Sequence, residues 1–215
     1  MHSRLRWQSL KEDNVREGIL PADRYEALRD ALPAYLRLAF VIAYHTGVRK
    51  GELLAIPHQR VDLAVGRIYL EAATTKNRTP RYLPVYGEMR AYLEMQLAEL
   101  DTAFPACRWL IHRKGHRIDS FNKAWKQAAA TAGVPDLLFH DLRRTALTNM
   151  ENAGVPRSVA TSISGHKTEY VYRRYLIRRA EAIDRAAAQM EAYLASSSFT
   201  GQSAGQSGSK TSKVN

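Results

Sequence analysis

The segment between Pro33 and Gly47 constrains the fold more than any other part of the chain. A proline opens it and a glycine closes it, as is typical of the start and the end of a helix. A helix that is apolar on most sides is stable only when other elements surround it. We therefore expect a central buried helix here, and its apolar positions are Tyr35, Leu36, Leu38, Ala39, Phe40, Ile42 and Ala43.

Short β-prone runs follow a brief helix at 49–56, which Pro57 limits because a proline disfavours the helical conformation of the residue before it. The runs cover 61–63, 67–70 and 82–85, and a turn at 64–66 separates the first two. They predict a small antiparallel sheet. The polar, cationic stretch at 74–80 suits a hairpin tip that reaches a ligand, and it carries Lys76.

The rest of the chain reads as helices separated by glycines. Pro21 opens a helical pattern before the central helix, and further helices are expected at 88–100, 120–132, 142–153, 158–164 and 181–195. The predicted fold class is therefore α+β, mostly helical with a small three-stranded antiparallel sheet. Residues 196–215 are almost devoid of apolar side chains, which predicts a disordered tail.

The charge balance indicates which class of binding partner to expect. Lys and Arg number 32 against 21 Asp and Glu, and the net charge of +11 attracts polyanions, nucleic acid first among them. A basic surface that serves only solubility is the alternative. The single cysteine, Cys107, excludes an internal disulfide and a cysteine cluster for zinc, which favours a reducing cytoplasm. No run approaches the ~20 apolar residues of a membrane span, so no membrane partner is expected.

Three segments place cationic side chains beside turns and helix starts, where they can converge on a phosphate. The first, T-G-V-R-K-G-E-L at 46–53, contains Arg49. The second, H-D-L-R-R-T at 140–145, contains His140 and Arg143, which would be neighbours on a helix that begins near His140. The third, G-H-K-T-E-Y-V-Y-R-R-Y at 165–175, contains His166 and Tyr175.

Each of these residues, taken singly, has an ordinary structural explanation. Arg49 could form an ion pair with Glu52. His140 could be a structural histidine, and His166 could cap a helix. Tyr175 would more often be a core residue than a nucleophile. No single position therefore distinguishes a structural residue from a catalytic one.

Taken together and in order, from about Gly18 to Leu194, the segments resemble the tyrosine recombinases, the phage integrases and their relatives. The family's three boxes read T-G-x-R-x-x-E-L, H-x-L-R-R-T, and G-H with a nucleophilic Tyr nine residues after the His. The positions that match are Arg49 and Glu52, then His140, Leu142, Arg143, Arg144 and Thr145, and finally Gly165, His166 and Tyr175. The resemblance implies a tyrosine recombinase catalytic domain at 19–195, with a linker segment at 1–18.

Phosphodiester cleavage without a metal needs a nucleophile, a proton acceptor, cations for the phosphoryl oxygens and an acid for the leaving oxygen. Arg49 and Arg143 offer planar, permanently charged donor pairs to the non-bridging oxygens. By resemblance Tyr175 is the nucleophile, and the product is a 3′ phosphotyrosine. Because one phosphoester replaces another, rejoining is expected to need no cofactor, neither ATP nor a metal.

The resemblance also gives roles to the remaining catalytic candidates. His140 assists the proton transfer from the tyrosine, and His166 donates a hydrogen bond to the phosphate. Lys76, in the hairpin where the family keeps its catalytic lysine, protonates the departing 5′ oxygen. Arg78 and Arg81 lie in the same hairpin and are its rivals for that role.

The chain departs from the family's pattern close to the third box. The family often has Leu before G-H where this chain has Ser164, and often Thr ahead of the Tyr where this chain has Val171 and Tyr172. These differences concern local packing more than chemistry.

His112 and His116, in H-R-K-G-H, are four residues apart and suggest a metal pair on a helix. The glycine between them and the lack of a nearby Cys or carboxylate cluster favour a turn that carries phosphate-facing charge.

By resemblance the partner is double-stranded DNA, on which a homo-tetramer assembles with exchange of the C-terminal helix at 181–195. Packing of that helix within its own chain is the alternative. Only about 18 residues precede the catalytic pattern, so the chain is either a fragment that lacks an N-terminal DNA-binding domain or a short member of the family. An inactive, architectural DNA-binding relative and a type IB topoisomerase are the competing functions.

Overall fold

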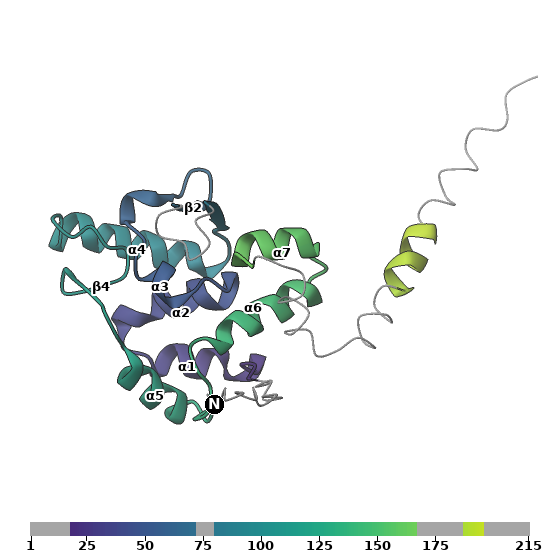
Figure 1. The fold of residues 1–215 in the computed structure, drawn as a ribbon, viewed down its shortest axis with the longest axis horizontal. Helices are drawn as coiled ribbons and strands as arrows, with labels where there is room; N and C mark the ends of the chain where they lie inside the picture. Colours follow the sequence, from purple (N-terminus) through teal and green to yellow (C-terminus); the bar gives the residue numbers. More distant parts are fainter. Residues whose placement is uncertain (1–17, 72–79, 167–186, 196–215) are drawn as a thin grey trace, which may run out of the picture. The chain divides into compact units, whose positions relative to one another are not determined.

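The structure is a computed structural model, which describes residues 18–71, 80–166 and 187–195. The chain divides into two compact units, residues 1–175 and 176–215. In the first unit, a 3₁₀ turn (η1, Ala22–Arg24) leads into helix α1 (Tyr25–Ala31), as the pattern after Pro21 predicted (Figure 1). In the second unit, residues 187–195 are helical. The domain boundaries expected at 18/19 and 195/196 stay predictions.

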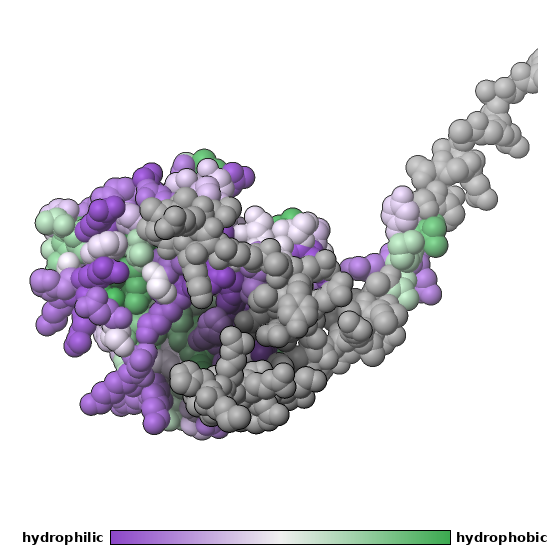
Figure 2. All heavy atoms as spheres, viewed as in Figure 1, coloured by the Kyte–Doolittle hydropathy of each residue, from purple (hydrophilic) through white to green (hydrophobic). Residues whose placement is uncertain are grey.

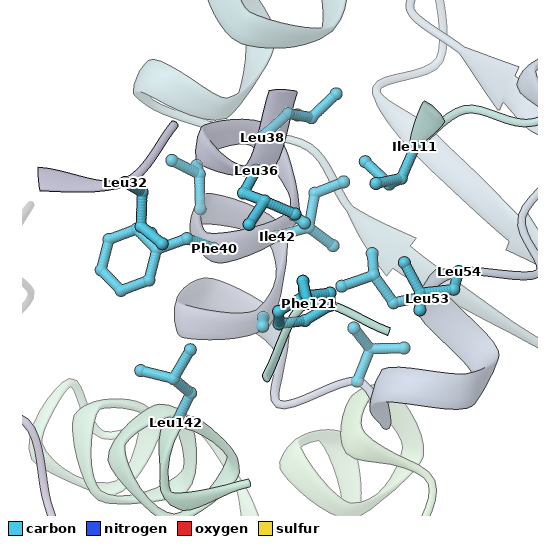
Figure 3. Close-up of a cluster of buried hydrophobic side chains, with 14 of the residues drawn as sticks. Leu32, Leu36, Leu38, Phe40, Ile42, Leu53, Leu54, Ile111, Phe121 and Leu142 are labelled. Carbon is cyan, nitrogen blue, oxygen red and sulfur yellow. The ribbon is translucent and has the colours of Figure 1, made fainter. Parts of the chain in front are cut away.

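Helix α2 (Ala34–Thr46) is the central buried helix that the sequence predicted. It contacts α1, α3 (Lys50–Leu53), α4 (Glu88–Ala103) and α6 (Asp141–Asn152). Leu36, Phe40 and Ile42 are almost fully buried, and Figure 3 shows them among side chains from the neighbouring elements. Gly47 ends the helix in the left-handed conformation, with φ of 65°. The core of the first unit therefore surrounds α2.

The three-stranded antiparallel sheet is also confirmed. It consists of β1 (Val61–Asp62), β2 (Arg67–Leu70) and β3 (Arg81–Pro84), in the order β1-β2-β3, and a short turn (η2, His58–Arg60) precedes it. Ile68 pairs with Leu83, and both are buried on the face toward the core. Strand β3 begins at Arg81, one residue earlier than predicted, and the Arg81 side chain is buried as well.

The later helices of the first unit agree with the predicted ranges to within a few residues at each end, and the start of the helix expected at 181–195 lies outside the described residues. Helix α5 (Asn122–Thr131) contacts α1, and helix α7 (Arg157–Ser164) contacts both α6 and β3. No helix in the described ranges is long and apolar enough to cross a membrane. On the face drawn in Figure 2, hydrophilic side chains predominate and hydrophobic ones occur in small groups.

A two-stranded hairpin, β4 (His112–Arg113) with β5 (His116–Arg117), was not predicted as strands. Lys114 and Gly115 form its turn, both with positive φ. The buried His112 ring accepts a hydrogen bond from the Gly115 amide at Nδ1, and its Nε2 lies 2.8 Å from the Gln96 amide nitrogen. The turn interpretation is therefore confirmed over a helical histidine pair, and His112 has a structural role.

Candidate active site

Arg49 lies at the start of α3, directly after the turn that ends α2. Its backbone N–H and its Nη1 donate to the two carboxylate oxygens of Glu52, over 3.3 Å and 3.1 Å. Its Nη2 donates to the backbone oxygen of Gly165, over 3.0 Å. The ion pair with Glu52 therefore exists, and it coexists with a contact to the third motif, 116 residues away in sequence.

Glu52 is almost fully buried and is shared with a second arginine. Arg81, on β3, donates from Nη2 to Glu52 Oε2 over 2.5 Å and from Nε to the Ile163 oxygen over 3.0 Å. Both side chains are at most 6% exposed. The Arg81 side chain thus connects β3 with α3 and α7. Because it is buried and paired with Glu52, it does not fit the role of an acid that replaces Lys76. The sequence interpretation of Arg81 was wrong on this point.

Arg143, in the first turn of α6, joins the three motifs. Its Nη1 donates to the backbone oxygens of Gly47 and Ser164, and its Nε donates to His166 Nε2 over 3.1 Å. The residue is only 3% exposed. A planar guanidinium reaches several acceptors in fixed directions, so these bonds define its orientation closely.

The glycine at position 47 is required by this arrangement. Besides its left-handed backbone, a Cβ there would meet Ala146 Cβ at 3.3 Å and the Arg143 backbone oxygen at 3.4 Å. The first motif therefore packs directly on α6 because no side chain intervenes.

His140 is the residue that precedes α6, and it is exposed. The surrounding protein atoms, and after them the positive charge of Arg143, lower the pKa of its imidazole. A lowered pKa keeps His140 neutral at neutral pH, as a proton acceptor must be.

His166 follows the left-handed Gly165 that ends α7. Burial, and after it the charges of Arg143 and Arg49, lower the pKa of His166 to about 3. Its Nδ1 lies 2.8 Å from the hydroxyl oxygen of Ser164. The ring is therefore neutral and is held by protein groups at both nitrogens.

Four of the six predicted site residues fall in the described ranges, and the structure brings them together: Arg49, His140, Arg143 and His166. Lys76 and Tyr175 lie outside those ranges. The arrangement combines fixed guanidinium groups with two neutral imidazoles, which suits an anionic substrate. The sequence did not reveal the structural roles of Arg81 and Ser164. Their partners include backbone oxygens and a distant carboxylate, which no local motif indicates.

Comparison with known proteins gives a consistent result. The model of the phage integrase family matches residues 8–181. The shufflon-specific DNA recombinase of Escherichia coli is 30% identical over 147 residues, which are 67% of this chain and 35% of that protein. The tyrosine recombinase XerC of Mycobacterium sp. (strain KMS) is 28% identical over 163 residues, covering 74% of this chain and 54% of that protein. The chain thus spans between about a third and about half of the length of these curated relatives.

Solved structures share the fold. The XerA recombinase crystal structure superposes with a TM-score of 0.68 at 20% identity, covering 80% of this chain and 65% of that one. A lambda integrase(75-356) dimer bound to a COC′ core site gives a TM-score of 0.63 at 21% identity, covering 79% and 62%. At this level of identity the likeness establishes the architecture alone.

Proposed function

This chain belongs to the phage integrase family, and on that premise we propose that it cleaves and rejoins DNA strands as the catalytic part of a site-specific tyrosine recombinase. The proposed reaction passes through a 3′ phosphotyrosine at Tyr175 and uses no metal ion and no ATP. The alternatives, strand relaxation and DNA binding without cleavage, have no specific observation in their favour.

One observation carries the proposal. The Arg143 guanidinium contacts Gly47 of the first motif and His166 of the third, while Arg49 contacts Gly165. Three short segments, far apart in sequence, therefore meet at one place, where the first two present the cations Arg49 and Arg143 beside the neutral His166 of the third. Binding a phosphodiester is the chemistry for which such fixed, charged donors are best suited.

In the proposed reaction, each step is carried out by a different residue of the site. Tyr175 attacks the scissile phosphorus, and because its ordinary pKa is about 10 it loses its proton during the attack. Neutral His140 assists that transfer. Arg49 and Arg143 stabilise the charge on the non-bridging oxygens, with His166 supporting these contacts.

Lys76 is the proposed acid that protonates the 5′ oxygen as it leaves. A 5′ hydroxyl from a partner strand then attacks the phosphotyrosine, which restores a phosphodiester and releases the tyrosine. The free energy of the broken bond is kept in the intermediate, so no other energy source enters.

Double-stranded DNA is the proposed partner, which the net charge of +11 supports. We further propose a tetramer on DNA with exchange of the C-terminal helix. The described part of that helix carries the apolar side chains Met190, Tyr193 and Leu194, which such docking would bury. The cytoplasm remains the expected compartment.

The experiment uses a suicide substrate, a duplex nicked next to the scissile phosphate so that the cleaved strand diffuses away and the covalent adduct accumulates. The Tyr175→Phe variant should form no adduct and should retain DNA binding, since only one hydroxyl is lost. Tyr172→Phe and Tyr170→Phe are the matched controls, and the DNA-linked peptide is mapped by mass spectrometry. An adduct that persists in Tyr175→Phe and disappears in Tyr172→Phe would move the nucleophile, and one that persists in all three would overturn the mechanism.

A further inference from the structure

A hollow of about 350 Å³ lies between α2, the β4–β5 hairpin and α5, and none of the catalytic candidates lines it. Rings of Tyr35 and Phe121 form part of its wall. No Asp or Glu is among the described residues that line it. Its remaining polar side chains can all donate hydrogen bonds, and two of them are cations: Arg113, Ser120, Asn122, Lys123 and Gln127. Such a lining is complementary to an anion.

The two cations of the hollow come from different elements. Arg113 belongs to β4, and its guanidinium carbon lies 5.2 Å from the centre of the Tyr35 ring. Stacking of this kind uses the face of the guanidinium and leaves the N–H groups at its edge for an anion. Lys123 belongs to α5, and both side chains are exposed to solvent. An anion in the hollow would therefore be approached by positive charge from the hairpin and from the helix.

Lys50 reaches the hollow from the first motif. Its Nζ lies 4.3 Å from the centre of the Phe121 ring and donates to Asn122 Oδ1 over 2.7 Å. An ammonium group can only donate, so the amide oxygen of Asn122 must face Lys50. The NH₂ group of the same amide is therefore turned away from the lysine, and its hydrogens can be donated to a ligand in the hollow.

This orientation of Asn122 favours a phosphate over a base as the ligand. The oxygens of a backbone phosphate only accept hydrogen bonds, which matches an amide that presents its NH₂ beside two cations. Asparagine reads adenine with its oxygen and its nitrogen together, whereas here Lys50 already occupies the oxygen. The chemistry of the hollow thus fits the DNA backbone, whatever the base sequence.

We propose that the hollow binds a phosphate of the DNA backbone other than the scissile one, with Arg113 and Lys123 as its cations. In this site Lys50 is a positioning residue, which turns the NH₂ group of Asn122 toward the phosphate. The inference rests on the proposed function and deepens it, because Lys50 directly follows Arg49 and a duplex held at the active site passes close to the hollow.

The test measures DNA affinity by fluorescence anisotropy with the full-length Tyr175→Phe protein, so that no cleavage is needed. Two labelled duplexes, one A·T-rich and one G·C-rich, are titrated at several salt concentrations. Arg113→Ala and Lys123→Ala should each reduce the slope of log affinity against log salt by about one, as loss of one phosphate contact does. Arg90→Ala is the matched control: it removes an exposed arginine of α4 outside the hollow, and the slope should stay unchanged.

The role of Lys50 is tested by a double-mutant cycle. Asn122→Ala and Lys50→Met should each lower the affinity roughly 3- to 10-fold, as loss of a directed hydrogen bond does. Because Lys50 acts through Asn122, the double variant should bind no more weakly than Asn122→Ala alone. Melting temperatures confirm that each variant is folded.

Equal losses for Arg90→Ala and the two cation variants would reduce the effect to general attraction and overturn the site. Losses that differ between the two duplexes would show contacts to bases and overturn the phosphate assignment. Additive effects of Lys50→Met and Asn122→Ala would mean that Lys50 touches the DNA itself, which overturns its positioning role. If Arg113→Ala and Lys123→Ala behave as expected while the wild type forms no adduct on the suicide substrate, the proposed function fails and the phosphate site stands.

Discussion

Arg81 and Gly165 approach so closely that a Cβ atom on Gly165 would lie 2.6 Å from Cζ of the Arg81 guanidinium. Gly165 also has φ of 72°, a conformation that other residues rarely adopt. The absence of a side chain at this position lets the guanidinium pass beneath the end of α7 and reach the Ile163 oxygen. The glycine of the third motif is therefore required by β3 as well as by its own turn.

Gly165→Ala should destabilise the protein and slow DNA cleavage. The left-handed backbone alone costs about 1–2 kcal/mol for a residue with a Cβ, and displacement of Arg81 adds to it. Urea unfolding measures the free energy of unfolding, and adduct formation on the suicide substrate measures the rate of DNA cleavage. Gly51→Ala is the control: a Cβ there meets nothing within 4 Å, so stability should be unchanged or rise by about 0.5–1 kcal/mol. Equal effects of the two substitutions would contradict the close approach.

Arg81→Ala should lower the free energy of unfolding by about 3–5 kcal/mol, because it removes one partner of the buried carboxylate of Glu52. Cleavage should fall with it, since Glu52 also holds Arg49. The matched control is Arg60→Ala, whose partner Glu71 forms a solvent-accessible pair, and its cost should stay below about 1 kcal/mol. If Arg81→Ala proved as mild as Arg60→Ala, the buried network would not stabilise the site.

Arg143→Lys should reduce cleavage by roughly 10²–10³-fold while DNA affinity changes little, since the charge remains but the planar set of donors is lost. Affinity is followed by fluorescence anisotropy and cleavage by adduct formation. Arg157→Lys, on the exposed side of α7, is the corresponding surface substitution and should leave both unchanged. Normal cleavage by Arg143→Lys would remove this arginine from the proposed phosphate contacts.

Lys76→Ala should slow cleavage of ordinary DNA, because no acid then protonates the leaving 5′ oxygen. A substrate with sulfur at the 5′ bridging position should restore the rate, since a thiolate leaves without a proton. Arg78→Ala is measured beside it on both substrates. Rescue of Arg78→Ala and not of Lys76→Ala would assign the acid to Arg78.

Stability should decrease as the pH falls below about 6.5. The pKa of His166 is lowered to about 3 in the folded protein, whereas in the unfolded chain it is about 6.5. Between these values the unfolded state binds the proton and the folded state does not, so acid favours unfolding. His45, His112 and His140, whose pKa values are also lowered, contribute in the same direction.

Urea unfolding at pH 7.5 and pH 5 measures this loss. His166→Gln should show a smaller loss than the wild type, because one of the contributing groups is gone. His116→Gln, at the exposed first residue of strand β5, should retain the wild-type loss. An identical pH dependence of His166→Gln and the wild type would mean that His166 does not titrate in this way.

Local patterns in the sequence predicted most of the fold. Pro33 and Gly47 bound α2 because each fixes a backbone conformation without help from distant residues, and the β-prone run at 67–70 indicated the strand that the structure shows there. The β4–β5 hairpin was missed because its strands are two residues each and owe their place to the contacts of His112 with Gln96.

Only the site residues that belong to the three sequence motifs could be predicted. Arg49, His140, Arg143 and His166 were identified by residue type and spacing, and the structure brings them together. Arg81 was named as a rival to Lys76 because it lies close to it in the sequence, whereas its acceptors are 29 and 82 residues away and hold it in a buried, structural position. Burial of a charge depends on such distant partners, and a single sequence does not display them.

The bond from Arg81 to the Ile163 oxygen has a consequence for protein engineering. Strand β3 carries no part of the three motifs, yet it holds α3 through Glu52 and α7 through this oxygen. A chimera that grafts the motifs of one recombinase onto another must therefore transplant the matching β3, or choose parents that share the arginine, the glutamate and the glycine. The unit of exchange is the strand together with the two helices that it joins.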